Sequence, residues 1–138
     1  MKKYKVGYTT GVFDLFHIGH LNLLKQAKDL CDYLIVGVST DENVLSYKHK
    51  IPIIPFNERA AIVESIKYVD KVVPQESMDK MEAWNKLKFD VLFHGDDWKN
   101  SEMYNMIIND FSKLGVDVVF LKHTSGISSS DIRKKING

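Results

Sequence analysis

The stretch VGYTTGVFDLFHIGHLNLLKQAKDLC, residues 6–31, joins a strand pattern to a helix pattern through a loop that holds two glycines and two histidines. Val6–Thr9 is an apolar, β-branched run, and the apolar residues from Leu21 to Cys31 recur at helical spacing. A buried strand that leads through a loop into a helix is typical of a parallel sheet whose faces are covered by helices. The stretch therefore predicts an α/β fold.

The same alternation continues to the end of the chain. Four further apolar runs with polar boundaries predict strands at Tyr33–Ser39, Lys71–Val73, Val91–His94 and Val116–Leu121, with helical spacing in the intervals. We expect one doubly wound, Rossmann-like domain over residues 1–138, with five parallel strands in the order 3-2-1-4-5.

Several residues predict where helices begin and end. Asn57 can cap the second helix pattern, Gly115 follows the fourth, and side-chain oxygens from Ser128 to Asp131 can cap a short last helix. Residues 46–55 contain two prolines and are predicted to form an irregular loop. A loop of that length is more often functional than structural.

Composition excludes several classes of protein. The chain has 138 residues, and 19 Lys and Arg against 18 Asp and Glu give a net charge of +1. This balance argues against a surface dedicated to nucleic acid or to an anionic membrane. Cys31 is the single cysteine, which excludes an internal disulfide and favours a reducing cytoplasm. No signal peptide or membrane span is predicted.

The loop after the first strand has the features of a phosphate site. Ligands of open parallel sheets bind beyond the carboxyl ends of the strands, where this loop is expected. Gly11 and Gly19 allow a ligand to approach the backbone, and the amides at the start of the next helix favour an anion. Two imidazoles, His17 and His20, can hydrogen-bond phosphoryl oxygens and offset charge during phosphoryl transfer.

Other readings of this loop exist. The two histidines can be polar surface residues of a helix start, or they can bind a metal, although zinc normally takes three or four protein ligands. The loop lacks the Gly-Lys-Ser/Thr of a Walker A loop, and its glycine spacing does not match the dinucleotide fingerprint. The combination of glycines, histidines and a strand-to-helix turn favours anion binding.

A second anion site is predicted near the end of the chain, where residues 126–133 read GISSSDIR. Hydroxyls and free amides at a helix start attract a phosphate, and Arg133 adds a cation about one turn into the helix. Taken alone, this serine run is an ordinary helix cap. Together with the histidine loop, it indicates a phosphate clamp.

The chain resembles a known family at both segments. HIGH at residues 17–20 is similar to the HxGH signature of the nucleotidyltransferase superfamily, and GISSSDIR is similar to its second signature. Three interior segments, STDE at 39–42, Arg59 with YVD at 68–70, and GDDW at 95–98, resemble the cytidylyltransferases, especially the glycerol-3-phosphate cytidylyltransferases. The resemblance runs from Lys5 to Ile136.

The resemblance implies a reaction. CMP would pass from CTP to a phosphorylated alcohol, most simply glycerol 3-phosphate, to give CDP-glycerol and pyrophosphate for cell-envelope synthesis. The substrate phosphate would attack the α-phosphorus directly, with Mg²⁺ as cofactor and a homodimer as the assembly. No nucleic acid or membrane partner is expected.

The resemblance also implies roles for individual residues. His17 and His20 would stabilise the pentacoordinate α-phosphate, and Asp14 would orient a histidine or assist a hydrated magnesium ion. Lys48 and Lys50 would reach the triphosphate or the substrate phosphate from the loop. The expected nucleotide contacts are Thr10, Gly11, Val12, Phe13, Gly19, Gly95, Asp97, Gly126, Ile127, Ser128, Ser129, Ser130 and Arg133. The expected contacts to the phosphorylated alcohol are Lys50, Arg59, Lys67, Asp41, Trp98 and His123.

Some of these assignments have alternatives. Arg59 can be an exposed helix arginine paired with Glu58 or Glu64, and the turn at 95–97 can be a plain loop. His123 and Lys67 stand where the glycerol-3-phosphate enzymes usually carry arginine, which leaves the acceptor open to ethanolamine, choline or polyol phosphates. An adenylyltransferase on the same scaffold and a non-catalytic CTP-binding regulatory module are the remaining alternatives.

Overall fold

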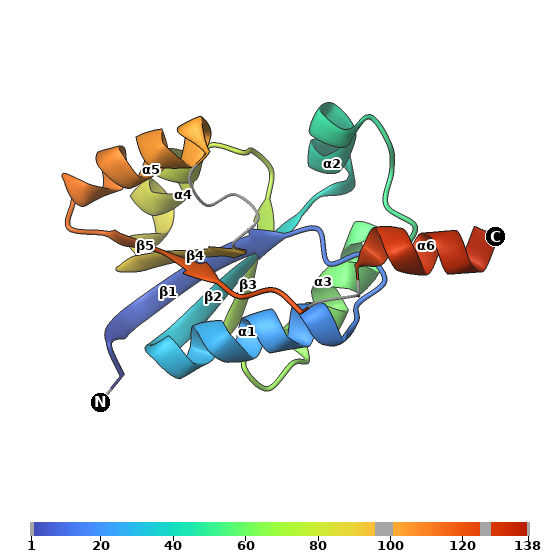
Figure 1. Cartoon of the computed structure of the whole chain (residues 1–138), viewed down its shortest axis with the longest axis horizontal. Coiled ribbons are helices and arrows are strands. Elements are labelled where there is room, and N and C mark those ends of the chain that lie inside the picture. The colour runs from blue at the N-terminus through green and yellow to red at the C-terminus, as the bar shows by residue number, and fades with distance from the viewer. Residues whose placement is uncertain (1, 96–100, 125–127, 138) are drawn as a thin grey trace.

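A computed structural model describes residues 2–95, 101–124 and 128–137 of the chain. Its centre is a parallel sheet in the order β3-β2-β1-β4-β5, which confirms the predicted strand order (Figure 1). The register pairs Thr9 of β1 with Val36 of β2 and with Phe93 of β4. The strands are β1 (Tyr4–Gly11), β2 (Cys31–Ser39), β3 (Lys71–Gln75), β4 (Val91–Gly95) and β5 (Asp117–Leu121).

Helices cover both faces of the sheet, as the alternation of strands and helices predicts (Figure 1). Along β2, Leu34 and Val36 point to the face with α1 and α3, and Ile35 points to the face with α4 and α5. None of the helices in the described residues is both long and apolar enough to span a membrane. The helices are α1 (Ile18–Leu30), α2 (Asp41–Lys48), α3 (Phe56–Glu64), α4 (Lys80–Leu87), α5 (Glu102–Ser112) and α6 (Ser129–Asn137).

Two local predictions are wrong. The segment predicted as a loop from residue 46 begins inside α2, which ends at Lys48 and is capped by His49 in the left-handed conformation. Asn57 does not cap α3, because Pro55 takes the cap position and Asn57 lies inside the helix. Proline suits a helix start, since the amide that it lacks would have no partner there. Gly115 has φ +73° just past α5, which confirms that prediction.

Candidate active site

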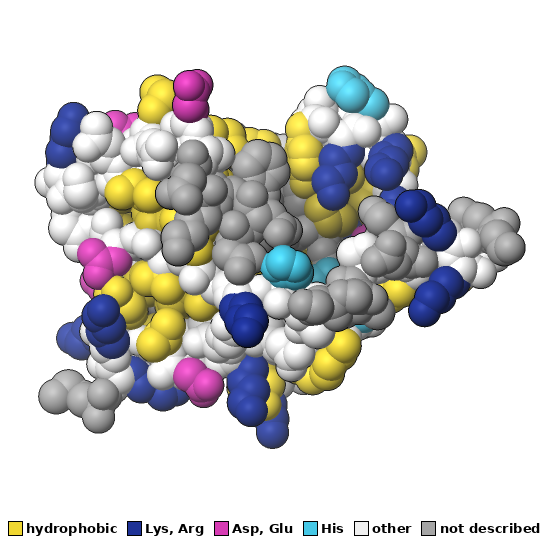
Figure 2. All heavy atoms as spheres, viewed as in Figure 1, with side chains coloured by type: hydrophobic (Ala, Val, Ile, Leu, Met, Phe, Trp, Pro, Cys, Tyr) yellow, Lys and Arg dark blue, Asp and Glu magenta, His cyan; other side chains and the backbone are white. Residues whose placement is uncertain are grey.

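Segments from distant parts of the chain meet at the carboxyl edge of the sheet. They enclose a cavity of about 210 Å³ between the end of β1, the start of α1, the end of α2 and α6. A space-filling view shows a hollow between the α2 and α6 regions, with histidine, lysine and arginine side chains around it (Figure 2). The cavity is lined by Thr10, Gly11, Val12, Phe13, Asp14, His20, Leu23, Lys48 and Arg133.

The two histidines cap the helix that they precede. The Nδ1 atom of His17 accepts the amide hydrogen of Gly19 at 3.0 Å, and the Nδ1 atom of His20 accepts that of His17 at 3.1 Å. The rings stack with centroids 3.9 Å apart. Because Nδ1 of both rings is an acceptor, the neutral rings carry their hydrogen on Nε2, where it is free to donate to a ligand.

Burial keeps both imidazoles neutral. The pKa of His17 is lowered by burial, and that of His20 falls to about 4, through burial first and then the neighbouring His17. Near neutral pH the pair therefore acts as two hydrogen-bond donors at the helix start, without positive charge. Such donors stabilise negative charge that develops on a phosphoryl oxygen.

The loop backbone is strained just before the two histidines. Phe13 and Leu15 have φ of +56° and +51°, which non-glycine residues rarely adopt. A Cβ atom at Gly11 would lie 2.9 Å from the Phe13 ring, so glycine is needed there for packing inside the loop. The Phe13 ring lies edge-on to His20, with centroids 5.4 Å apart. Strain held by packing of this kind is typical of functional loops.

Asp14 fastens two loops together. It is 3% exposed, and its two carboxylate oxygens accept the amide hydrogens of Ile53 and Ile54, each at 2.9 Å. Sequence reasoning placed this residue beside a histidine or a magnesium ion. In the structure both carboxylate oxygens are used to anchor the segment between α2 and α3, which carries Lys50, to the histidine loop.

Arg59 and Asp41 reinforce the same junction. The guanidinium of Arg59 donates to the carbonyl oxygens of Val12, Ser39 and Ile54 at 2.7 to 2.8 Å and pairs with Asp41 at 2.6 Å. Arg59 is 1% exposed, so the alternative of an exposed helix arginine is wrong. Its side chain has no surface on which a substrate could bind, and the predicted contact to the phosphorylated alcohol does not fit this geometry.

Three cations, Lys48, Lys50 and Arg133, gather at the cavity, and none of them forms an ion pair with a carboxylate of the described residues, although the charge of Asp14 acts on Lys48. Lys48 and Arg133 line the main cavity, and with Lys50 they line a smaller hollow beside it. The pKa of Lys48 is lowered by burial and then by the charges of Lys50 and Arg133. The Nε atom of Arg133 is buried and has no hydrogen-bond partner among the described residues. This arrangement stabilises a polyanion, because each cation destabilises the others until a negative ligand arrives.

Lys80 is a functional candidate that sequence reasoning missed. It begins α4, is 7% exposed, and its Nζ atom donates to Thr10 Oγ1 at 2.7 Å. Burial lowers its pKa to about 8. Thr10 lines the active-site cavity, so this buried amine lies beside it. The sequence gives no signal of this contact, because it joins residues 70 positions apart.

The remaining predicted residues fall into three groups. His123 and Ser128 lie after β5 and before α6, at the carboxyl edge, where Asn22 donates to Thr124 at 2.9 Å. Lys67 precedes β3 and therefore lies at the opposite, amino edge of the sheet, so its predicted substrate contact is wrong for a site formed by one chain. Asp97, Trp98, Gly126 and Ile127 lie outside the described residues, as do the side chains of Ser129 and Ser130.

The described residues contain no preformed metal centre. They contain no group of three or more His, Cys, Asp or Glu side chains placed to hold a metal ion. Asp14, the carboxylate at the cavity, has both oxygens occupied by amides.

Comparison with known proteins identifies the family. A family model described as cytidylyltransferase-like matches residues 8–135. Glycerol-3-phosphate cytidylyltransferase of Staphylococcus aureus is 38% identical, over 94% of this chain and 93% of that protein. The enzyme of the same name from Bacillus subtilis is 39% identical, over 94% of this chain and 95% of that protein. Ethanolamine-phosphate cytidylyltransferase of Arabidopsis thaliana is 33% identical, over 91% of this chain and 30% of that protein.

Solved structures of known proteins support the same fold and family. The lipopolysaccharide core biosynthesis protein of Thermoplasma volcanium superposes with a TM-score of 0.73 and 32% identity, over 88% of this chain and 97% of that one. Pantoate-beta-alanine ligase of Francisella tularensis, at 15% identity and a TM-score of 0.63, covers 99% of this chain and 70% of that one and shares the fold. By its sequence match over residues 8–135 and by its fold, the chain belongs to the cytidylyltransferase-like family.

Proposed function

We propose that this protein transfers CMP from CTP to a phosphorylated alcohol, with glycerol 3-phosphate as the first candidate, and releases pyrophosphate. The observation that carries the proposal is that His20 and Arg133 line one and the same cavity. These residues come from the two segments that sequence analysis assigned to one phosphate chain. Two relatives that match over nearly the whole length of both chains, at 38% and 39% identity, are glycerol-3-phosphate cytidylyltransferases, which favours that acceptor.

The geometry supports direct transfer. A phosphate oxygen of the acceptor would form a bond to the α-phosphorus of CTP while the bond to the bridging oxygen of the β-phosphate breaks, and that oxygen leaves with pyrophosphate. The Nε2–H groups of His17 and His20 would donate to the α-phosphoryl oxygens. Arg133, Lys48 and Lys50 would neutralise the departing pyrophosphate. Magnesium would enter with the nucleotide as its phosphate complex.

Lys80 would hold the phosphate of the acceptor. It is a buried amine with a single hydrogen bond among the described residues, to Thr10 at the rim of the cavity. Its pKa of about 8 reflects desolvation, and a bound phosphate would restore its full charge. The proposal further places the enzyme in the cytoplasm as a homodimer that supplies CDP-glycerol for cell-envelope synthesis.

The test is a pyrophosphate-release assay with Mg²⁺ and CTP against a panel of acceptors: glycerol 3-phosphate, phosphoethanolamine, phosphocholine and polyol phosphates. We expect release that depends on both CTP and an acceptor, with the highest kcat/KM for glycerol 3-phosphate. A higher kcat/KM for another acceptor would show that this acceptor, and not glycerol 3-phosphate, is the substrate of the same transfer reaction. Binding of CTP without release for any acceptor would favour a regulatory module.

Nucleotide choice is tested separately by thermal shift. CTP with Mg²⁺ should raise the melting temperature more than ATP does at equal concentration, because a ligand stabilises the folded state that binds it. Stabilisation by ATP alone would contradict the cytidylyl assignment and favour an adenylyltransferase.

A further inference from the structure

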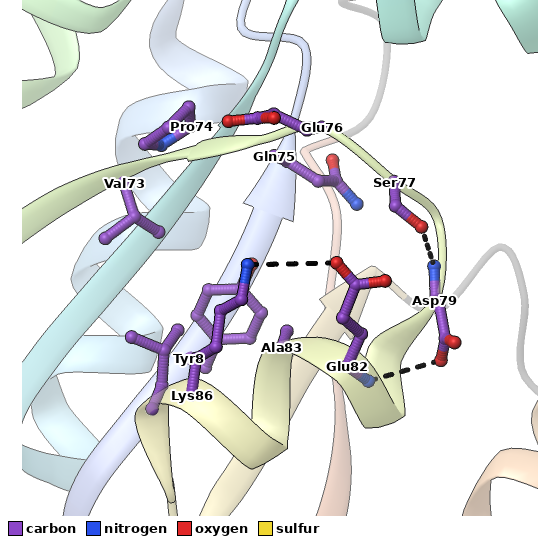
Figure 3. A pocket seen from close by; sticks show the side chains of 11 residues that line it. Tyr8, Val73, Pro74, Gln75, Glu76, Ser77, Asp79, Glu82, Ala83 and Lys86 are labelled. Carbon is purple, nitrogen blue, oxygen red and sulfur yellow. Dashed lines mark hydrogen bonds and ion pairs between the residues drawn. The ribbon is translucent and has the colours of Figure 1, made fainter.

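A second cavity of about 210 Å³ lies between the end of β3 and α4, on the face of the sheet that α4 and α5 cover (Figure 3). It shares no lining residue with the active-site cavity. Ala83 and Leu87 of α4 form one wall, and Val73 of β3 forms another. A dry cavity of about 150 Å³ accommodates a benzene ring, so this space has room for a molecule of about eight non-hydrogen atoms.

The floor of the cavity is formed by a buried tyrosine, Tyr8. Tyr8 is 2% exposed and its ring stacks on Phe89, with centroids 5.0 Å apart. Its Oη atom lies above Gly37, where a Cβ atom would approach it to 2.5 Å. Burial raises the pKa of Tyr8 to about 12, so the phenol stays neutral near pH 7. No hydrogen bond joins this hydroxyl to the described residues, so it is available to a ligand or to water in the cavity.

Acceptor atoms dominate the rest of the lining. Gln75 is 7% exposed and its Nε2 atom donates to Met78 Sδ at 3.7 Å, while its side-chain oxygen has no donor among the described residues. Three carboxylates, Glu76, Asp79 and Glu82, and one cation, Lys86, line the cavity. Lys86 lies 3.8 Å from Glu82, whereas the Asp79 carboxylate caps α4 by accepting the amide hydrogens of Met81 and Glu82 (Figure 3). An anion would be repelled here, and a molecule that donates hydrogen bonds and carries positive charge would be attracted.

We propose that this cavity is a second ligand site that binds a small organic cation, with its ammonium group at the carboxylate rim and Gln75 and its apolar body against Ala83, Leu87 and the Tyr8 ring. The Tyr8 hydroxyl forms a hydrogen bond with a polar group of the ligand, either directly or through a water molecule that is bound with the ligand. The proposal does not depend on the reaction assigned to the active site.

Three probes of nearly equal size separate the ligand classes: benzylamine, benzyl alcohol and benzoate. Each is titrated into the full-length protein, and amide shifts are followed by NMR. Benzylamine should move signals of residues 73–77 and 82–87 with a Kd of the order of 1 mM, as expected for a ligand of this size. Benzyl alcohol should bind at least about five-fold more weakly, the effect of a lost charged hydrogen bond, and benzoate should not bind. Saturating CTP should leave the Kd of benzylamine unchanged.

Variants test the location. Ala83→Leu fills the cavity and should abolish benzylamine binding, whereas Ala61→Leu, the same change on the exposed side of α3, should not. Glu82→Gln should weaken benzylamine about five-fold and leave benzyl alcohol unchanged. Tyr8→Phe should weaken benzylamine by a similar factor of about five. Unchanged amide signals of residues away from the cavity show that Ala83→Leu is folded. Equal binding of benzoate, shifts confined to other residues, or unchanged affinity in Ala83→Leu would overturn the proposal.

Discussion

Two buried cations lie in two regions of this molecule, and their surroundings differ. Arg59, at the junction of α2, α3 and the histidine loop, has four hydrogen bonds to the protein, one of them to the carboxylate of Asp41. Lys80, at the start of α4, has one hydrogen bond among the described residues, to the hydroxyl of Thr10. Arg59 is 1% exposed and Lys80 is 7% exposed, so burial alone does not distinguish them.

The difference lies in whether the protein itself satisfies the charge. A buried cation with a full set of partners holds structure together, and its removal leaves carbonyls and a carboxylate unpaired. A buried cation with one neutral partner destabilises the unliganded protein, and its charge is completed by a ligand. We therefore infer that Arg59 holds the histidine loop and the segment between α2 and α3 in place. We infer that Lys80 binds the phosphorylated alcohol.

Replacement of Arg59 should have the largest effect. Arg59→Met removes the guanidinium and leaves Asp41 and three carbonyl oxygens without their donor, so the free energy of unfolding should fall by about 3–5 kcal/mol. Urea denaturation measures this loss. Lys25→Met, at an exposed position of α1, serves as the control and should change stability by less than about 0.5 kcal/mol. A stable Arg59→Met protein with impaired catalysis would reverse the assignment.

Replacement of Lys80 should weaken binding of the phosphorylated alcohol without lowering the stability of the fold. Lys80→Met removes a desolvated amine, so the melting temperature should stay the same or rise. The KM for the phosphorylated alcohol should increase by about 10- to 100-fold, the effect of one lost charged hydrogen bond to phosphate. Initial-rate kinetics at saturating CTP give this value. A large loss of stability with an unchanged KM would make Lys80 a structural residue like Arg59.

The pH dependence of stability that arises from His20 should be the smallest of these effects. The pKa of His20 is about 4 in the folded protein and about 6.5 when unfolded, so the unfolded chain binds the extra proton between these values. Stability should therefore be fully present above pH 6.5 and fall towards pH 4, by roughly 1–2 kcal/mol after allowance for the partial exposure of the ring. Urea denaturation of the wild type and of His20→Asn at several pH values isolates this contribution. Parallel curves would contradict the burial of the neutral ring.

The sheet and the convergence of HIGH at residues 17–20 with GISSSDIR at residues 126–133 could be predicted from the sequence. Strand periodicity, helix periodicity and the two motifs are local patterns, which a sequence shows directly. The sequence did not predict α2, whose eight residues, DENVLSYK, bury the polar Asn43 beside Val44 and so lack an amphipathic pattern. The environments of Arg59 and Lys80 also escaped prediction. Both environments arise from contacts between residues that are distant in the chain. No local sequence pattern indicates that either side chain is buried.

The most direct test of the proposed mechanism combines turnover and binding in one pair of variants. His17→Ala and His20→Ala remove hydrogen-bond donors whose full strength is reached only as charge develops on the α-phosphate. Each should lower kcat for pyrophosphate release by the order of 10²-fold or more, while the Kd for CTP changes comparatively little. Unchanged turnover in both variants would contradict the account.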